Sequence, residues 1–380
     1  MTRRSPVRSS DPWPPSPSVD EETAVIKIVH FDAARVVVGV DTHKDEHVAV
    51  AINGLGTHLG EHSCRVTLAG YEDLERWAVG LGNVVSFGVE GTGSFGAGLA
   101  RFLSGQGHTV IEVNRPDRSI RRRVGKSDPI DAEAAARSVL AGVATGVPKS
   151  GTHGVEMIRM LKVAKDSAMK ARTQATNQVK ALVLTAPTEL RQALDGLSAS
   201  RLIRRCAGFR RGDVVTPMAA ARFALRSLAR RHQQLTAELK VINAELTNIT
   251  AKIAPALLQA FCVGPDSAAA LLITAGDNPE RLKSESAFAA LCGVSPIPAS
   301  SGKTNRHRLN RGGDRRANSA LHRVIIVRLR HDERTRKYMA RRTAEGMTKL
   351  QVIRCLKRYL AREVYAILRS TTQQNLIQGA

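Results

Sequence analysis

The stretch Ala34-Arg-Val-Val-Val-Gly-Val40 is rich in β-branched residues and leads directly into an acidic residue, Asp41. Such a run favours a β-strand. A second apolar run, residues 48–52, follows after a short polar turn. The pair therefore predicts a β-hairpin with a carboxylate near its tip. Strand ends are also where open α/β sheets bind their ligands.

Strands and helices continue to alternate as far as residue 150. The pattern predicts a strand near 59–66, a helix near 71–79, a strand at 84–89 that ends in Glu90, a helix at 94–104, a strand at 108–113, a basic loop at 115–126 and a helix that opens at 127–131. This order of elements is that of a ribonuclease H-like core, so we expect an α/β fold for the N-terminal third.

Four acidic residues occupy strand ends or a helix start in this arrangement: Asp41, Glu90, Asp128 and Asp131. Asp128 and Asp131 are three residues apart and share one helix face, and Pro129 suits the first helical turn. Taken singly, each acid is explained as a helix cap, a turn residue or a solvated strand end. Together, oxygen ligands from three separated segments predict a site for Mg²⁺, with Mn²⁺ as an alternative.

The segment Gly91-Thr-Gly-Ser-Phe-Gly96 offers a competing interpretation, because it spells the dinucleotide-binding pattern after a strand. That pattern normally belongs to the first strand of a domain, whereas three strands precede it here. We therefore expect these glycines to form a tight turn that allows a close approach of the backbone.

Composition indicates a polyanionic partner. The 380 residues carry a formal net charge of +23, and residues 300–370 alone contain 20 basic and 5 acidic residues, a net charge of 20 − 5 = +15. Such a charge favours nucleic acid as the partner.

Five scattered cysteines favour a reducing cytoplasm and argue against structural zinc. No membrane span is expected, and residues 1–33 are expected to form a disordered basic tail.

Two long helices are predicted at residues 155–184 and 217–253. The second carries apolar residues at alternating steps of three and four, interrupted only by His232: Leu225, Leu228, His232, Leu235, Leu239, Ile242, Leu246, Ile249 and Ile253. This heptad pattern predicts a coiled coil. The pattern does not decide whether the partner is the first helix or another protomer, but it favours a contribution to oligomerisation.

The C-terminal third contains two further signals. A Gly264-Pro265 turn between helices resembles a helix-hairpin-helix, which grips DNA phosphate with backbone N–H groups. Next, Ser300-Ser-Gly302 precedes a basic stretch and a helix predicted at 315–330. A serine among cations suits a nucleophile that attacks a phosphodiester, although most such segments are only turns.

Six motifs in this order resemble the IS110 family of insertion-sequence transposases over roughly residues 35–330. They are Gly39-Val-Asp-Thr-His-Lys-Asp45, Glu90-Gly-Thr-Gly93, Lys126-Ser-Asp-Pro-Ile-Asp-Ala132, Gly293-Val-Ser-Pro296, Ser300-Ser-Gly302 and Arg311-Gly-Gly-Asp314. Two departures are the second glycine of the last motif, where Arg-Gly-Asn is more usual, and the Pro-rich N-terminal extension.

The resemblance implies a RuvC-like domain whose DEDD carboxylates, Asp41, Glu90, Asp128 and Asp131, bind Mg²⁺, and a transposase domain whose catalytic serine is Ser301, with Ser300 as the alternative. It also implies a homo-oligomer, dimeric or tetrameric, that recombines donor and target DNA under guidance of a structured bridge RNA, in the bacterial cytoplasm near the nucleoid. The expected division is a tail (1–33), the RuvC-like domain (34–148), a helical coiled-coil region (149–255), the transposase domain (256–350) and a basic C-terminal helix and tail (351–380).

Two alternatives remain open from the sequence. The carboxylates alone suffice for a metal-dependent, structure-selective endonuclease that makes no covalent intermediate. The basic surface alone suffices for a nucleic-acid-binding protein without catalytic activity, in which the carboxylates are caps.

Overall fold

The computed structural model describes residues 34–114, 127–278, 281–302 and 307–378. The predicted N-terminal tail and the predicted basic loop at 115–126 lie outside these ranges.

The N-terminal part is a five-stranded mixed sheet with the strand order β3-β2-β1-β4-β5. The strands are β1 (Arg35–Thr42), β2 (Glu46–Asn53), β3 (His58–Arg65), β4 (Asn83–Glu90) and β5 (Val110–Val113). The first three are antiparallel, and β4 and β5 run parallel to β1. The order of strands and helices expected from the sequence is confirmed.

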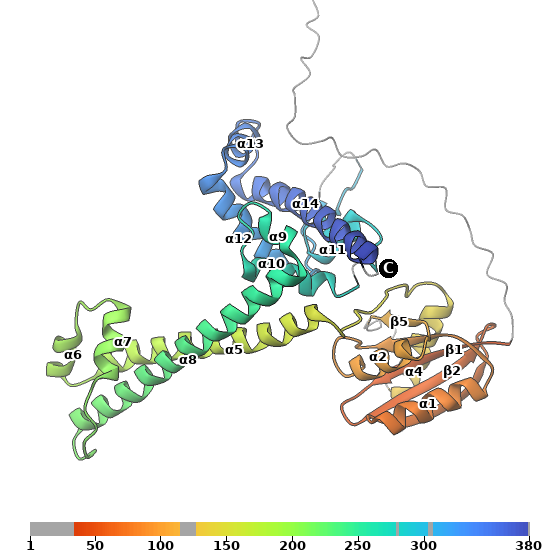
Figure 1. Cartoon of the computed structure of the whole chain (residues 1–380), viewed down its shortest axis with the longest axis horizontal. Helices are drawn as coiled ribbons and strands as arrows, with labels where there is room; N and C mark the ends of the chain where they lie inside the picture. Colours follow the sequence, from red (N-terminus) through yellow and green to blue (C-terminus); the bar gives the residue numbers. More distant parts are fainter. Residues whose placement is uncertain (1–33, 115–126, 279–280, 303–306, 379–380) are drawn as a thin grey trace, which may run out of the picture.

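Helices cover both faces of this sheet, which explains why β1 is an unbroken apolar run. Val36, Val38 and Val40 face a core shared with α1 (Leu68–Gly80) and α2 (Ala97–Gly105). Val37 faces the opposite core, shared with α4 (Asp128–Leu140). The alternation follows the two-residue period of a strand, and Figure 1 shows α1 and α4 around the sheet.

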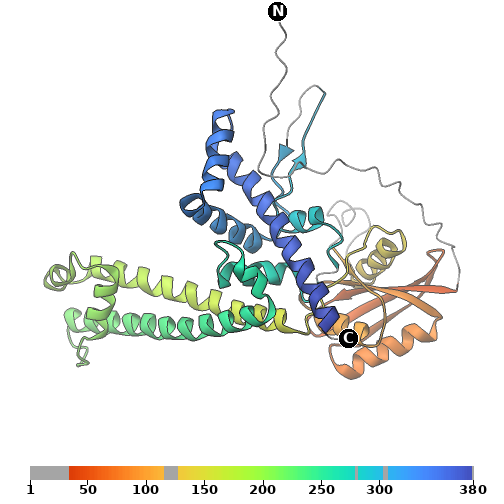
Figure 2. The same ribbon diagram turned by 45° about the horizontal axis from the view of Figure 1, so that its top comes forward.

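A long helical arm leaves the sheet. It consists of α5 (Gly154–Thr185) and α8 (Pro217–Ile253), with two short helices, α6 (Thr188–Leu194) and α7 (Ala199–Ala207), at the far end (Figures 1 and 2). Thr216 caps α8 by accepting a hydrogen bond from the Ala219 N–H. Helix α8 lies alongside α5 of the same chain (Figure 2), and its seam residues Leu225 and Leu246 are buried in cores that include residues of α5, so the intrachain pairing that the sequence left open is the one observed. Oligomerisation remains a prediction.

The C-terminal part is mainly helical. Its elements are α9 (Pro255–Gln259), α10 (Pro265–Ala275), α11 (Glu285–Leu291), a small hairpin of β6 (Ile297–Pro298) and β7 (His307–Arg308), α12 (Arg315–His331), α13 (Glu333–Ala344) and α14 (Lys349–Gln378). The helices among them share one apolar core, which also contains Val155 and Ile158 of α5 and Leu246 of α8. The base of the arm is therefore part of this core.

A short linker ties the sheet to these helices. The Asp277 carboxylate accepts hydrogen bonds from the Val155 and His153 N–H groups at the start of α5. Lys149 donates to the Ile273 carbonyl at 2.6 Å, and Asn278 donates to the Pro148 carbonyl at 2.9 Å. Among the described helices, none is both long enough and apolar enough to cross a bilayer.

Candidate active site

The carboxyl ends of two neighbouring parallel strands carry the first two predicted acids. Val40 pairs with Val89, so Asp41 and Glu90 occupy the next positions of β1 and β4. Both residues are buried, at 7% and 8% exposure. The Thr42 hydroxyl donates to the Glu90 carbonyl oxygen at 2.9 Å and holds the two strand ends together.

A close helix–strand approach brings in the other two acids. A Cβ atom on Gly39 would lie 2.0 Å from the Ala132 carbonyl oxygen, so the backbone of α4 rests directly on β1. The first turn of α4 carries Asp128 and the buried Asp131. Only glycine permits this contact, and it places the start of α4 beside the end of β1.

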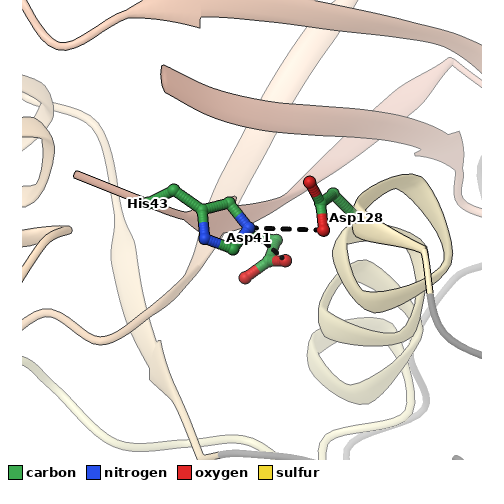
Figure 3. Close-up of side chains that lie close together, drawn as sticks. All are labelled: Asp41, His43 and Asp128. Atoms are coloured by element: carbon green, nitrogen blue, oxygen red, sulfur yellow. Dashed lines mark ion pairs between the residues drawn. The ribbon is translucent and has the colours of Figure 1, made fainter. Parts of the chain in front are cut away.

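His43 joins this cluster. Its Nε2 atom lies 3.3 Å from an oxygen of Asp41 and 3.3 Å from an oxygen of Asp128, as Figure 3 shows. Together Asp41, His43 and Asp128 offer one ligand atom each within 4.8 Å of one another. Sequence reasoning missed this histidine, although it lies two residues after Asp41 in the polar turn between the first strands.

The electrostatics of the cluster suit a cation. Burial raises the pKa of Asp41, the neighbouring His43 lowers it, and the charges of Asp131 and Asp128 raise it further. A carboxylate that is buried beside other carboxylates is costly to ionise. Carboxylate oxygens and an imidazole nitrogen are also ordinary ligands of divalent metals. The residues present therefore fit a divalent cation.

Glu90 and Asp131 complete the predicted set in different ways. Asp131 acts on Asp41 through its charge, and Glu90 lies at the same edge of the sheet on the neighbouring strand. The residues whose ligand atoms lie within 4.8 Å of one another are Asp41, His43 and Asp128.

The glycines after Glu90 shape a turn. Gly91 has a φ of +65°, and a Cβ atom on Gly96 would lie 2.7 Å from the Glu90 carbonyl oxygen. The turn ends in α2, which starts at Ala97, three residues later than predicted. These close contacts agree with the expected structural role of the glycines.

The predicted serines lie on the β6–β7 hairpin. Ser300 and Ser301 are exposed and follow β6. The hairpin projects from the C-terminal helices, away from the sheet (Figure 2). The structure thus does not bring the serines to the carboxylates of the same chain.

Two glycine motifs support this hairpin. A Cβ atom on Gly313 would lie 2.2 Å from the Gly293 nitrogen, so two backbone segments cross in direct contact. Asn318 donates to the Cys292 and Gly293 carbonyl oxygens at 3.1 and 3.0 Å. Asp314 caps α12 by accepting from the Arg316 and Ala317 N–H groups. The motifs around residues 293 and 313 therefore fix the base of the hairpin.

A basic groove of about 1460 Å³ starts at the hairpin base and runs along α14. Its lining includes seven lysine and arginine residues and one acidic residue: Arg308, Arg311, Arg315, Arg354, Lys357, Arg358, Arg362 and Glu285. Glu285 pairs with Arg358 and Arg362. Burial and the neighbouring Arg354 lower the pKa of Lys357, so an entering anion would favour its charged form.

The predicted helix-hairpin-helix segment lies between α9 and α10. Gly264 precedes Pro265 at the start of α10. In the first turn, Asp266 accepts hydrogen bonds from Lys162 and Lys165 of α5, each at 2.6 Å. This helix start is thus tied to the arm, and phosphate binding there remains a prediction.

Comparisons with known proteins identify the family. A family model described as a transposase, of the DEDD type of IS110, matches residues 38–186. A second model, described as the transposase of the IS116/IS110/IS902 family, matches residues 254–340. The insertion element IS110 uncharacterized 43.6 kDa protein of Streptomyces coelicolor is 30% identical over 161 residues, 42% of this chain and 38% of that protein. The aligned part is therefore well under two thirds of this relative. The first model covers the sheet and α5, and the second covers the serine-bearing region. The chain belongs to the IS110 family of transposases.

Proposed function

We propose that this protein is the recombinase of an insertion sequence, which cleaves and joins donor and target DNA. The observation that carries the proposal is the convergence of buried carboxylates from β1, β4 and α4 at one edge of the sheet. Acids from separate segments that meet at one place can hold a metal ion for phosphoryl transfer. Acids that only cap helices or end strands would have no reason to meet.

The sheet topology supports a RuvC-like domain at residues 34–148. Three antiparallel strands followed by two parallel ones, in the order β3-β2-β1-β4-β5, agree with a ribonuclease H-like core. The remaining proposed units are the helical arm (149–255), the transposase domain (256–350) and the C-terminal helix and tail (351–380).

In this proposal Asp41, Glu90, Asp128 and Asp131 hold Mg²⁺, with Mn²⁺ as an alternative, and His43 orients the carboxylates of Asp41 and Asp128. The ion would supply Lewis-acid activation of the scissile phosphate. The acids are held in place by the strand pairing and by the contact of α4 with Gly39.

Ser301 is the proposed nucleophile, with Ser300 as the alternative. Its Oγ atom forms a bond to phosphorus while the bond to one strand oxygen breaks; the serine proton is lost and the leaving oxygen takes up a proton as a hydroxyl. A DNA hydroxyl then reverses the attack, so the phosphodiester bond energy is conserved. The exposed position of both serines and the basic groove at the base of their hairpin support this role.

A structured bridge RNA is the proposed source of sequence specificity. The strong positive charge and the 4% content of aromatic residues suit a protein that binds backbones and leaves base reading to base pairing. The serine hairpin projects away from the carboxylates, which favours a homo-oligomer in which two protomers complete one site.

The test is recombination between donor and target plasmids in cells that also carry the element's flanking non-coding sequence. We expect Asp41→Ala and Ser301→Ala to abolish joining, and Ser300→Ala to retain it. Loss with Ser300→Ala alone would move the nucleophile to Ser300. Normal joining by both serine variants would exclude the covalent mechanism and favour the metal-dependent endonuclease.

A further inference from the structure

The far end of the arm is strongly basic, and the proposed reaction does not use it. Residues 188–231 contain ten arginines, three acidic residues and no lysine, a net charge of 10 − 3 = +7. The segment forms α6, α7 and the start of α8. Since α8 has 37 residues, the arm extends about 55 Å, and Figure 1 shows its tip far from the sheet and from the C-terminal helices.

Helix α7 divides sharply into two faces. Leu202, Ile203 and Cys206 are buried in a small apolar core with α5, α6 and α8. Arg201, Arg204 and Arg205 are exposed, and their spacing puts all three on the opposite face. The buried face fixes the helix on the arm, so the arginine face is turned outward.

These three arginines lack acidic partners in the part of the chain that the structure describes. Some arginines elsewhere are paired with acids, such as Arg159 with Glu156 at 2.6 Å and Arg328 with Glu363 at 2.8 Å. Helix α7 itself contains no acidic residue. An unneutralised arginine face is complementary to phosphate, which guanidinium groups bind in a bidentate manner.

The connection between α6 and α7 is a short turn. Residues 195–198 join the two helices, and Gly196 has a φ of +66°, which favours glycine. Two short helices that contribute to one apolar core and are joined by a tight glycine-containing turn resemble a helix-turn-helix, whose second helix enters the major groove of DNA. Here the second helix is the one that carries the arginine face.

We propose that the tip of the arm is a second DNA-docking surface, on which α7 presents Arg201, Arg204 and Arg205 to the major groove of duplex DNA. The choice of DNA follows from groove shape. The major groove of B-form DNA is wide enough for a helix, whereas that of A-form RNA is deep and narrow. Docking at this distance from the serines would hold DNA beyond the point of cleavage.

The test compares two triple variants of the full-length protein with equal changes in charge. The tip variant is Arg201→Gln, Arg204→Gln, Arg205→Gln. The control is Lys170→Gln, Lys240→Gln, Lys252→Gln, which removes three exposed cations from the shaft of the arm, the parts of α5 and α8 that lie away from the apolar core of the tip. Binding to a 40-base-pair DNA duplex and to an RNA duplex of equal length is measured by fluorescence anisotropy at several salt concentrations in EDTA.

We expect the tip variant to bind the DNA duplex at least about tenfold more weakly, with a salt dependence reduced by about two to three counterions. The control should change little, and RNA duplex binding should be equal in both variants. Helical content and Tm verify that the arm is folded. The charge-conserving variant Arg201→Lys, Arg204→Lys, Arg205→Lys should keep the salt dependence of the wild type.

Three results would overturn the proposal: equal DNA binding by the tip and shaft variants, a loss confined to RNA, or an altered oligomeric state in sedimentation with unchanged DNA binding. Because the assay excludes divalent ions and needs neither the carboxylates nor the serines, its outcome is independent of whether the proposed recombination is correct.

Discussion

A single glycine determines how closely α4 approaches β1. Because a Cβ atom on Gly39 would lie 2.0 Å from the Ala132 carbonyl and 2.3 Å from the Ala136 nitrogen, both backbone atoms, a side chain there cannot be accommodated by rotamer changes. We expect Gly39→Ala to push α4 away, to lower the free energy of unfolding by about 2–3 kcal/mol and to abolish recombination. Urea unfolding measures the first effect and the plasmid assay the second.

Gly80→Ala is the matched control for this prediction. Gly80 ends α1, and a Cβ atom there has no neighbour within 4 Å. Alanine is the better helix former, so this change should be neutral or stabilising by up to about 1 kcal/mol. Equal stability of the two variants would mean that α4 does not rest on β1 at Gly39.

The sequence predicts the positions of some site residues and not of others. The positions of Asp41 and Glu90 at strand ends follow from apolar runs that stop at an acid, and the structure places both there. His43 was not predicted, because its role depends on the distance between the turn after β1 and the start of α4, which local pattern does not encode. The separation of the serines from the acids is likewise a property of the tertiary arrangement.

At the scale of elements, one carboxylate ties α10 to α5 and α12. Asp266 accepts hydrogen bonds from Lys162 and Lys165, which are only 6% and 8% exposed, and pairs with Arg323 at 3.0 Å. Burial alone would raise the pKa of Asp266, but the hydrogen bonds from the two lysines outweigh it and hold the pKa well below its ordinary value. The ionised form therefore stabilises the junction between arm and C-terminal helices.

We expect Asp266→Asn to lower the free energy of unfolding by about 2–3 kcal/mol at neutral pH, since the buried Lys165 loses its anionic partner. A depressed pKa contributes stability above the unfolded-state value of about 4 and loses it as the pH falls below that value. The gap between wild type and variant should therefore narrow between about pH 4 and pH 2. Urea unfolding at pH 7 and pH 3 measures it.

Asp213→Asn serves as the control, because Asp213 is an exposed acid in the loop before α8. It should leave the stability within about 0.5 kcal/mol of wild type at both pH values. If Asp266→Asn behaves like Asp213→Asn, the arm is held by the apolar core alone and the charge cluster contributes no net stability.

Element boundaries were largely predictable, and element partners were not. The heptad pattern of α8 predicted a helix over residues 217–253, which are the observed bounds. The same pattern suits any apolar helix of matching spacing, so it could not select α5 of the same chain over another protomer. Short connections account for the pairing of β1 with β2 and of β2 with β3, but not for β4 beside β1, because residues 43–82 separate these two strands.

At the scale of the whole molecule, the carboxylates and the serines of the proposed site belong to different parts of the fold. The carboxylates belong to the sheet, and the serines belong to a hairpin on the C-terminal helices that projects away from it (Figure 2). In this structure the serines and the carboxylates of one chain therefore lie apart. A symmetric dimer can bring them together, because the serine hairpin of each protomer can then contact the carboxylates of the other by the same interface.

This arrangement predicts complementation between inactive variants. Asp41→Ala retains the serine and Ser301→Ala retains the carboxylates, so a mixed dimer contains one intact composite site. Equal mixtures that exchange subunits should yield on the order of a quarter of the wild-type covalent protein–DNA adduct, since half of the dimers are mixed and each has one good site of two. The adduct is measured on denaturing gels with the two variants tagged differently, and it should form on the Asp41→Ala protomer.

A mixture of Asp41→Ala with Glu90→Ala is the control. It lacks an intact carboxylate set on either chain and should give no adduct. If the first mixture is as inactive as the second although both variants fold and bind DNA, each chain closes its own site, and the hairpin must then move to the sheet during the reaction.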